Sequence, residues 1–233
     1  MYPVAILTGG LATRLLPITE TIPKALVEVA GKPFIFHQLD WLQTQKIEKV
    51  VLCVGHLGEK IQVRVGNGDA WGIDISYSFD GEKLLGTGGA LKKATPFLGR
   101  EFFVFYGDSF LPIQFKPVAD TFQRSGMPAL MTVLRNEGRW DKSNVVFCNG
   151  KLLEYNKYKT NLKMTHIDYG LAIIKAEVFS SNPTGSCFDL ADIYESLAKK
   201  SQMVGYEVMH RFYEIGSKEG LASTENYLKN NPS

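Results

Sequence analysis

The stretch LTGGLATRLLPITETIPKAL (residues 7–26) begins where a short apolar run, VAIL (residues 4–7), ends. It contains glycines, prolines and isolated cations, so it is too polar for a core. This combination of residues is also too specific for a simple connection between two elements. In open α/β sheets the ligand crevice lies beyond the carboxyl ends of the strands. A loop that starts at the end of the first strand therefore occupies the place where such a sheet binds its ligand.

The rest of the first half of the chain supports such a sheet. Short apolar, β-branched runs alternate there with helical patterns, which is the rhythm of βαβ units. The strand-like runs are residues 2–7, 49–54, 73–78 and 102–106, and the patterns between them include residues 33–45 and 57–65. VVLCV and FFVFY are apolar throughout, as expected when helices cover both faces of a parallel sheet. We expect an α/β, Rossmann-like, doubly wound and mostly parallel sheet.

The pattern changes after about residue 128, where strands follow one another closely. They are residues 129–135, 144–148, 151–157 and 169–175, and two helical patterns at 189–200 and 218–228 then bracket a strand at 203–208. Asn149-Gly150 favours a hairpin turn. These features predict a small mixed or antiparallel extension. One domain over residues 1–233 suits this length, with two halves that meet near residue 128.

Composition excludes several classes of protein. Lys and Arg number 26 against 24 Asp and Glu, and they form no basic block, so we expect no nucleic-acid partner. The sequence shows neither a basic leader nor a long apolar run, so we expect no membrane partner and a cytoplasmic location. The three cysteines and four histidines lack metal-ligand spacing. The choice between a monomer and a homodimer stays open.

The loop at residues 7–26 carries the groups that a phosphate site needs. Gly9 and Gly10 lack a Cβ, so their backbone amides can approach an anion closely. Arg14 can fork onto phosphate oxygens, and Lys24 adds a compact ammonium. The spacing matches neither GxxxxGK[ST] nor GxGxxG, so a different kind of phosphate site is required and a dehydrogenase is disfavoured. The alternative is a surface turn with solvated charges.

The same loop resembles the signature of the sugar nucleotidyltransferases, GGxGTRLxPxTxxxPK. The matching positions are Gly9, Gly10, Thr13, Arg14, Leu15, Pro17, Thr19, Pro23 and Lys24. Ala12 replaces the usual glycine. The chain is most similar to the short heptose 1-phosphate guanylyltransferases and N-acetylmuramate 1-phosphate uridylyltransferases, from Val4 to about Leu228. The resemblance implies the nucleotide-diphospho-sugar transferase fold and the joining of a nucleoside triphosphate to a sugar 1-phosphate, for polysaccharide or other glycan precursors.

This resemblance assigns roles in the first half, residues 1–127, which would bind the nucleotide. Arg14 and Lys24 would be catalytic. The nucleotide contacts would be Leu7, Gly9, Gly10, Thr13, Arg14, Gly86, Thr87 and Gly88. The last three belong to GTGG, similar to the LGTxGAL segment of the family, where we expect a helix to start with Thr87 as its cap.

The resemblance also implies a Mg²⁺ site. Asp108 follows the strand FFVFY and one glycine, as in the GD motif of the family, and a carboxylate suits Mg²⁺ between phosphates. Glu214 stands where the family writes the second metal-binding Asp, and its side chain is one methylene longer. The alternative for Asp108 is a cap of the following turn.

The second half, residues 128–233, would bind the sugar phosphate. Lys157 lies where the family has the lysine of its EKP segment, although Asn156 and Tyr158 replace the neighbouring acid and proline. Asp168 and Gly170 lie where the family lines its sugar pocket.

The sequence leaves three matters open. The base could be guanine, uracil, cytosine or thymine, and the sugar a heptose, a hexose or an amino sugar; heptose or hexose guanylyl, uridylyl or cytidylyl transfer is the favoured set. A non-catalytic relative that binds a nucleotide or nucleotide sugar is the alternative. Ala12 and Glu214 favour that alternative, whereas Arg14, Lys24 and Asp108 favour catalysis.

Overall fold

The computed structural model of this chain describes residues 1–10, 15 and 18–231. The predicted roles of Thr13 and Arg14, and the substitution at Ala12, fall outside these residues. All that follows concerns the described part of the chain.

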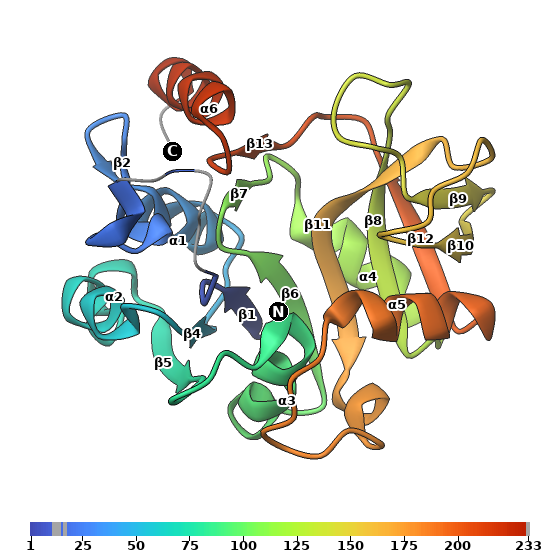
Figure 1. Cartoon of the computed structure of the whole chain (residues 1–233), viewed down its shortest axis with the longest axis horizontal. Helices are drawn as coiled ribbons and strands as arrows, with labels where there is room; N and C mark the ends of the chain where they lie inside the picture. Colours follow the sequence, from blue (N-terminus) through green and yellow to red (C-terminus); the bar gives the residue numbers. More distant parts are fainter. Residues whose placement is uncertain (11–14, 16–17, 232–233) are drawn as a thin grey trace.

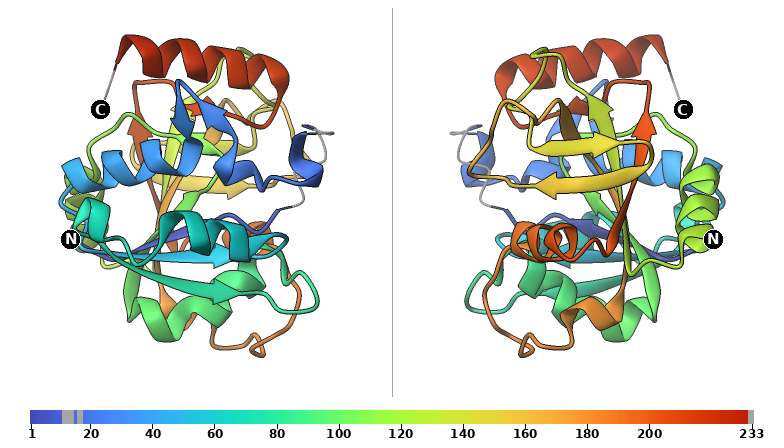
Figure 2. Two further views of the ribbon diagram at one scale, coloured as in Figure 1. Left: turned by 90° about the vertical axis from the view of Figure 1, so that its left-hand side faces the viewer. Right: turned by 90° about the vertical axis from the view of Figure 1, so that its right-hand side faces the viewer.

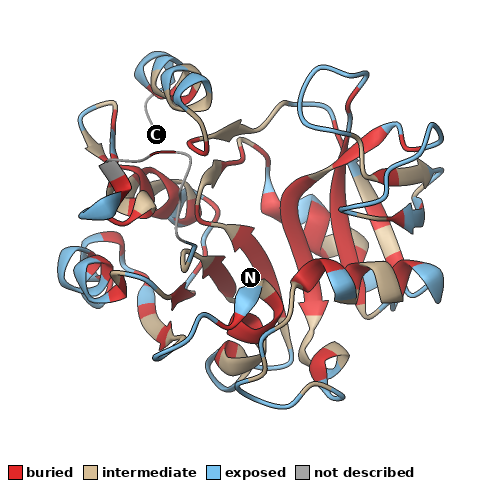
Figure 3. Ribbon diagram, in the orientation of Figure 1, coloured by how far each residue is buried: buried red, intermediate tan, exposed pale blue. Residues whose placement is uncertain are grey.

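A nine-stranded sheet runs through both halves of the molecule, in the order β5-β4-β1-β6-β11-β8-β12-β10-β9 (Figure 1). Its first four strands are mutually parallel. They are β5 (Asp74–Phe79), β4 (Lys49–Val54), β1 (Val4–Leu7) and β6 (Glu101–Tyr106). The remaining five are β11 (His166–Lys175), β8 (Ala129–Arg135), β12 (Met203–Val208), β10 (Lys151–Tyr155) and β9 (Val145–Cys148). Most of β1, β6, β8 and β11 is buried (Figure 3).

Helices cover both faces of this sheet, because successive strand residues point to opposite sides and both sides are apolar. One core contains Ile6 of β1 together with residues from α1 (Phe34–Thr44), α2 (Gly58–Val65) and α4 (Phe115–Ser125). The opposite core contains Ala5 and residues from α3 (Gly86–Leu98) and α5 (Leu190–Lys199). The predicted Rossmann-like, doubly wound α/β sheet is confirmed.

The second half is mixed in direction, as predicted. Strand β11 is antiparallel to both β6 and β8, whereas β8 and β12 are parallel. Strands β9 and β10 form a hairpin across Asn149 and Gly150, whose φ angles of 48° and 76° suit the expected turn. Val145 of β9 also pairs with His166 of β11, so this end of the sheet curls back on itself.

Strand β11 starts three residues earlier than the predicted strand at 169–175 and contains a bend. Its pairing with β8 shifts register between Asp168 and Ala172, and Gly170 has a φ of +100°. Only glycine adopts such a φ readily, so the bend depends on this residue. The part before the bend pairs with β8 and β9, and the part after it pairs with β6 and β8.

Short elements complete the molecule. Strand β13 (Tyr213–Glu214) pairs with β7 (Ser109–Phe110), and β2 (Glu28–Val29) pairs with β3 (Lys32–Pro33). Helix α6 (Lys218–Asn230) lies at the opposite end of the molecule from α3 (Figure 2). The 3₁₀ helices are η2 (Ile18–Glu20), η3 (Lys24–Leu26), η4 (Asp69–Trp71) and η5 (Ala176–Phe179). None of the described helices has the length and apolarity needed to cross a bilayer.

Candidate active site

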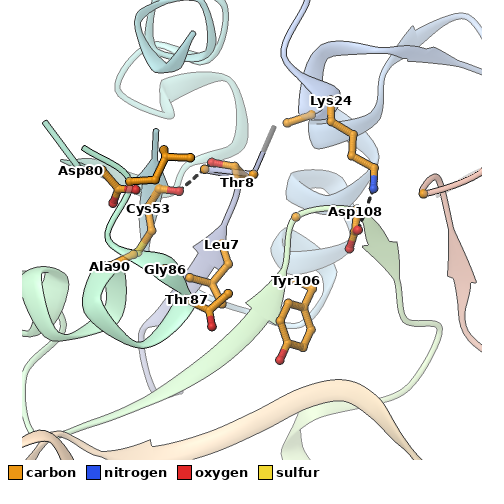
Figure 4. A pocket seen from close by; sticks show the side chains of 16 residues that line it. Leu7, Thr8, Lys24, Cys53, Asp80, Gly86, Thr87, Ala90, Tyr106 and Asp108 are labelled. Carbon is orange, nitrogen blue, oxygen red and sulfur yellow. Dashed lines mark hydrogen bonds and ion pairs between the residues drawn. The ribbon is translucent and has the colours of Figure 1, made fainter. Parts of the chain in front are cut away.

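A cavity of about 400 Å³ opens at the carboxyl ends of the parallel strands (Figure 4). Each of these strands, or the loop after it, contributes to the lining: Leu7 from β1, Cys53 from β4, Asp80 after β5, and Tyr106 and Asp108 from the end of β6 and beyond. Parallel strands end at one edge, so residues far apart in sequence meet there. The predicted contacts Leu7, Gly9 and Gly10 all line this cavity.

The two glycines after β1 have different surroundings. A Cβ on Gly9 would lie 3.1 Å from the amide nitrogen of Gly55, and one on Gly55 would lie 2.7 Å from the carbonyl oxygen of Gly9. The loops after β1 and β4 therefore need glycine for their close approach. Among the described residues, a Cβ on Gly10 would meet nothing within 4 Å. Of the two glycines, Gly10 is therefore the one that the described residues leave open to a ligand.

Lys24 and Asp108 meet across the cavity. The Lys24 ammonium lies 2.8 Å from the Asp108 carboxylate, with the two side chains 15% and 36% exposed. The 3₁₀ helix η3 carries Lys24 and follows Pro23, whose extended backbone sets the direction of the arm. A cation and a carboxylate that are 84 residues apart in the chain thus share one site.

Glu214 lies beside Asp108 in the backbone, but its carboxylate faces elsewhere. It pairs with Ser109 across β13 and β7, and the Ile215 amide donates to the Asp108 carbonyl oxygen at 2.9 Å. The Glu214 carboxylate accepts a hydrogen bond from the Gly216 amide at 2.9 Å. Gly216 lines the cavity, whereas Glu214 is absent from the described lining. Its role as second metal ligand stays a prediction.

The donor set that the structure shows for a metal is therefore small. The described residues contain no cluster of three or more His, Cys, Asp or Glu side chains that could hold an ion. Mg²⁺, however, binds through one or two carboxylates together with substrate phosphates and water. The Asp108 carboxylate, which reaches the cavity, fits that requirement.

The start of α3 differs from the prediction. The helix begins at Gly86, one residue before Thr87, and no side chain caps it. The Thr87 hydroxyl instead donates to Asp189 and accepts from the Leu190 amide, both at 2.8 Å. Gly86 and Thr87 line the cavity.

Gly88 is used for packing. Its amide donates to the Phe188 carbonyl oxygen at 3.0 Å, and a Cβ on it would lie 2.4 Å from the Phe188 ring. It is absent from the described lining of the cavity. The segment 186–190, here called the strap, therefore covers the start of α3 and accounts for this glycine.

In the half of the chain predicted to bind the sugar phosphate, Asp189 forms an ion pair with Lys157. The Lys157 ammonium lies 2.6 Å from the Asp189 carboxylate, and the Tyr158 hydroxyl donates to the same oxygen at 3.1 Å. Asp189 also caps α5 by accepting from the Ala191 amide. Although burial alone would raise it, hydrogen bonds from Ala191, Lys157 and Thr87 lower the pKa of Asp189 to about 2. Sequence reasoning missed this residue, although its place before an apolar helical pattern is typical of a cap.

Asp168 lies near Lys157 at the bend of β11. Burial raises the pKa of Asp168 to about 6, although the Gly170 amide, which donates to its carboxylate at 3.0 Å, and the charge of Lys157 act in the opposite direction. Burial and the charge of Asp168 in turn raise the pKa of Tyr106, which lines the cavity. Lys157 and Asp168 are absent from the described lining. Asp189 links Lys157 to Thr87, which lines the cavity.

Asp80 is a second acidic residue in the cavity that the sequence did not single out. It follows β5 directly, much as Asp108 follows β6, and this position was the available signal. Its carboxylate accepts from the Leu85 amide at 3.2 Å. Burial raises its pKa.

Comparison with known proteins gives relatives of one kind. The nucleotidyl transferase family model matches residues 4–142. The chain is 30% identical over 209 residues to the UTP–glucose-1-phosphate uridylyltransferase of Synechocystis, which covers 82% of this chain and 54% of that relative. The chain thus spans about half the length of that relative.

Two further comparisons cover nearly the whole chain. The D-glycero-alpha-D-manno-heptose 1-phosphate guanylyltransferase of Campylobacter jejuni is 27% identical over 215 residues, covering 92% of this chain and 94% of its own. HddC from Yersinia pseudotuberculosis complexed with GMP-PN superposes with a TM-score of 0.79 at 20% identity, over 98% of this chain and 100% of the other. At that identity the superposition supports the fold.

Proposed function

The chain belongs to the nucleotidyl transferase family, and on that premise we propose that it joins a nucleoside triphosphate to a sugar 1-phosphate and releases pyrophosphate. The observation that carries the proposal is the cavity at the strand ends, where Lys24 and Asp108 meet beside the open backbone of Gly10. A cation, a carboxylate and free backbone groups suit a chain of phosphates.

The reaction is a displacement at phosphorus. An oxygen of the sugar 1-phosphate attacks the α-phosphorus, and the bond to the oxygen that bridges the α- and β-phosphates breaks, so pyrophosphate leaves with the electron pair. The attacking phosphate is already an anion, so the step needs no general base. The task of the protein is to bring two anions together and stabilise the charge of the transferring group.

The residues of the cavity divide this task. Gly9 and Gly10 hold the triphosphate together with Arg14, and Lys24 neutralises charge near the reacting phosphates. When bound, Mg²⁺ would be held by Asp108, with Glu214 as the proposed additional ligand, and it would supply further positive charge near the reacting phosphates. In the structure the Lys24 ammonium forms an ion pair with the Asp108 carboxylate. This ion pair must open when the substrates bind.

The sugar side completes the site. Lys157 has three ammonium donors, of which Asp189 needs one, so the others remain for the incoming phosphate. Asp168 and the bend at Gly170 line the sugar pocket behind Tyr106. The favoured substrates are heptose and hexose 1-phosphates, and the product serves glycan assembly. Because the reaction consumes nucleoside triphosphate, we place it in the cytoplasm.

The alternative is a relative that binds nucleotide without turning it over. The hydrogen bond that the Glu214 carboxylate accepts from the Gly216 amide favours this alternative. A pyrophosphate-release assay with GTP, UTP, CTP and dTTP against a panel of sugar 1-phosphates, with the mass of the product as readout, separates the two. We expect release that requires Mg²⁺ and a product mass equal to that of a nucleotide sugar. Nucleotide binding without pyrophosphate release in every combination would favour the alternative.

A further inference from the structure

The two ends of the cavity differ in chemistry. Figure 4 shows Lys24 and Asp108 on one side and Asp80 with Cys53 on the other, with Leu7 and Tyr106 between them. The Asp80 side also has Leu84 and Ala90 in its lining. One end is therefore ionic, and the other is an apolar slot with one carboxylate in it.

This difference gives a bound nucleotide a direction, if the proposed function holds. The phosphates belong at the end with the Lys24 ammonium, because the Asp80 carboxylate at the other end would repel them. The base then lies at the Asp80 end, where apolar walls suit the faces of a flat ring. The backbone of Gly86 also lines this end.

The Asp80 carboxylate can accept further hydrogen bonds from such a base. A carboxylate is an acceptor with about four lone-pair positions, and within the described part of the chain the Asp80 carboxylate accepts one hydrogen bond, from the Leu85 amide. The nearby Lys93 ammonium donates to the Asp80 carbonyl oxygen at 3.2 Å and not to its carboxylate. A Cβ on Gly9 would lie 3.5 Å from an Asp80 carboxylate oxygen, so this carboxylate lies close to the loop after β1.

We propose that Asp80 makes this site selective for guanine. Guanine carries an N1–H and an exocyclic N2 amino group side by side, and this pair of donors matches the two oxygens of a carboxylate. Uracil and thymine present one N–H between two carbonyl oxygens. Cytosine and adenine present an amino group beside an acceptor nitrogen. In each of these four bases an acceptor faces the carboxylate, which adds repulsion to the lost hydrogen bond.

The test is nucleotide binding, measured by calorimetry with Mg²⁺ and GTP, ITP, UTP or CTP. ITP has the N1–H of GTP but lacks the N2 amino group, so it removes one of the two donors. We expect GTP to bind most tightly, ITP about 10-fold more weakly, and UTP and CTP about 10- to 100-fold more weakly than GTP. Asp80→Asn should raise the Kd for GTP about 10- to 100-fold and bring it close to the value for UTP.

Glu82→Gln is the matched control. It removes the same charge from the same loop, but Glu82 is exposed and absent from the described lining of the cavity. We expect it to keep the wild-type order of affinities. The GTP and ITP comparison on the wild-type chain needs no variant, so it decides the matter even if Asp80→Asn folds poorly.

Two results would overturn guanine selection: a wild-type chain that binds UTP or CTP as tightly as GTP, or an Asp80→Asn chain that keeps the GTP preference. The pyrophosphate-release assay shows which proposal has failed. Turnover with UTP or CTP at the rate found with GTP leaves the transferase proposal standing and removes this one. The absence of binding and of turnover with every triphosphate removes both.

Discussion

Two Lys–Asp pairs stand on the two sides of the candidate site, and they differ in how firmly the aspartate is held. Lys24 and Asp108 lie 2.8 Å apart, and among the described residues the Asp108 carboxylate accepts one further hydrogen bond, from the Ser109 hydroxyl at 3.2 Å. Asp189, which lies 2.6 Å from Lys157, also accepts from a backbone amide and from two other hydroxyl groups. The first pair can exchange its partners for ligands, whereas the second is part of the scaffold.

The largest effect is expected at Asp108, the aspartate of the first pair. We expect Asp108→Ala to lower turnover about 100-fold or more, because a preorganised charge at the reacting phosphates is lost. Its effect on the free energy of unfolding should be small, because the pair is partly exposed. Steady-state kinetics over a Mg²⁺ titration, with thermal unfolding alongside, measures both.

Asp120→Asn is the control for that experiment, since Asp120 pairs with Lys116 on the surface of α4. It should match the wild type in both measurements. Near-normal, Mg²⁺-dependent turnover by Asp108→Ala would end the assignment of Asp108 as the metal ligand.

The strap that carries Asp189 should be sensitive to added volume. A Cβ on Gly89 would lie 2.3 Å from the Ser186 carbonyl oxygen, which is backbone and cannot turn aside. We expect Gly89→Ala to lower the free energy of unfolding by about 1–3 kcal/mol in urea denaturation. Gly10→Ala, where a Cβ would meet none of the described residues within 4 Å, should leave stability unchanged. Equal stabilities for the two variants would contradict the packing role of the strap.

Asp189→Asn tests whether the second pair positions Lys157. The amide can still accept from Ala191 and Thr87, but it loses the charge that holds the ammonium. We expect the KM for the sugar 1-phosphate to rise about 10-fold while the KM for the triphosphate stays near its wild-type value. Tyr158→Phe, which removes one hydroxyl contact, should change neither value by much. Equal effects on both KM values would point to a general loss of structure.

The smallest expected effect concerns Asp168. Its pKa is raised to about 6 in the folded chain, first by burial, so the carboxyl favours folding when protonated. Its contribution is fully present below the pKa of the unfolded chain, about 4, and is lost as the pH rises through 6. We expect Asp168→Asn to raise the free energy of unfolding by about 1 kcal/mol at pH 8 relative to wild type, with little change at pH 4. The same gain at both pH values would contradict burial of the charge as the cause.

Much of the fold could be read from the sequence because apolar periodicity reports which faces are buried. The runs at 50–54 and 102–106 are apolar throughout, and the strands that contain them, β4 and β6, each lie between two other strands of the sheet. The exception is β11, which continues through Gly170 to His166. Its first part pairs with β8 and β9, and no local pattern marks a strand whose partners lie elsewhere in the chain.

Part of the candidate site could also be predicted from the sequence. The sequence predicted that Lys24 and Asp108 share one crevice, and the structure places both in one cavity. The sequence also predicted Gly88 as a nucleotide contact, whereas in the structure Gly88 packs against the strap, residues 186–190. Asp80 and Asp189 were missed because a single carboxylate carries no spacing signal, and only its neighbours show its chemistry.

The sequence by itself determined the elements, the doubly wound class and the family, because periodicity and a dense local motif are written in consecutive residues. The tertiary structure decided which charges face one another: Lys24 with Asp108, and Lys157 with Asp189. It also placed Asp80 in the cavity. Electrostatic interaction depends on distance and on access to solvent. Both are set by how parallel strands that are distant in the sequence end at one edge of the sheet.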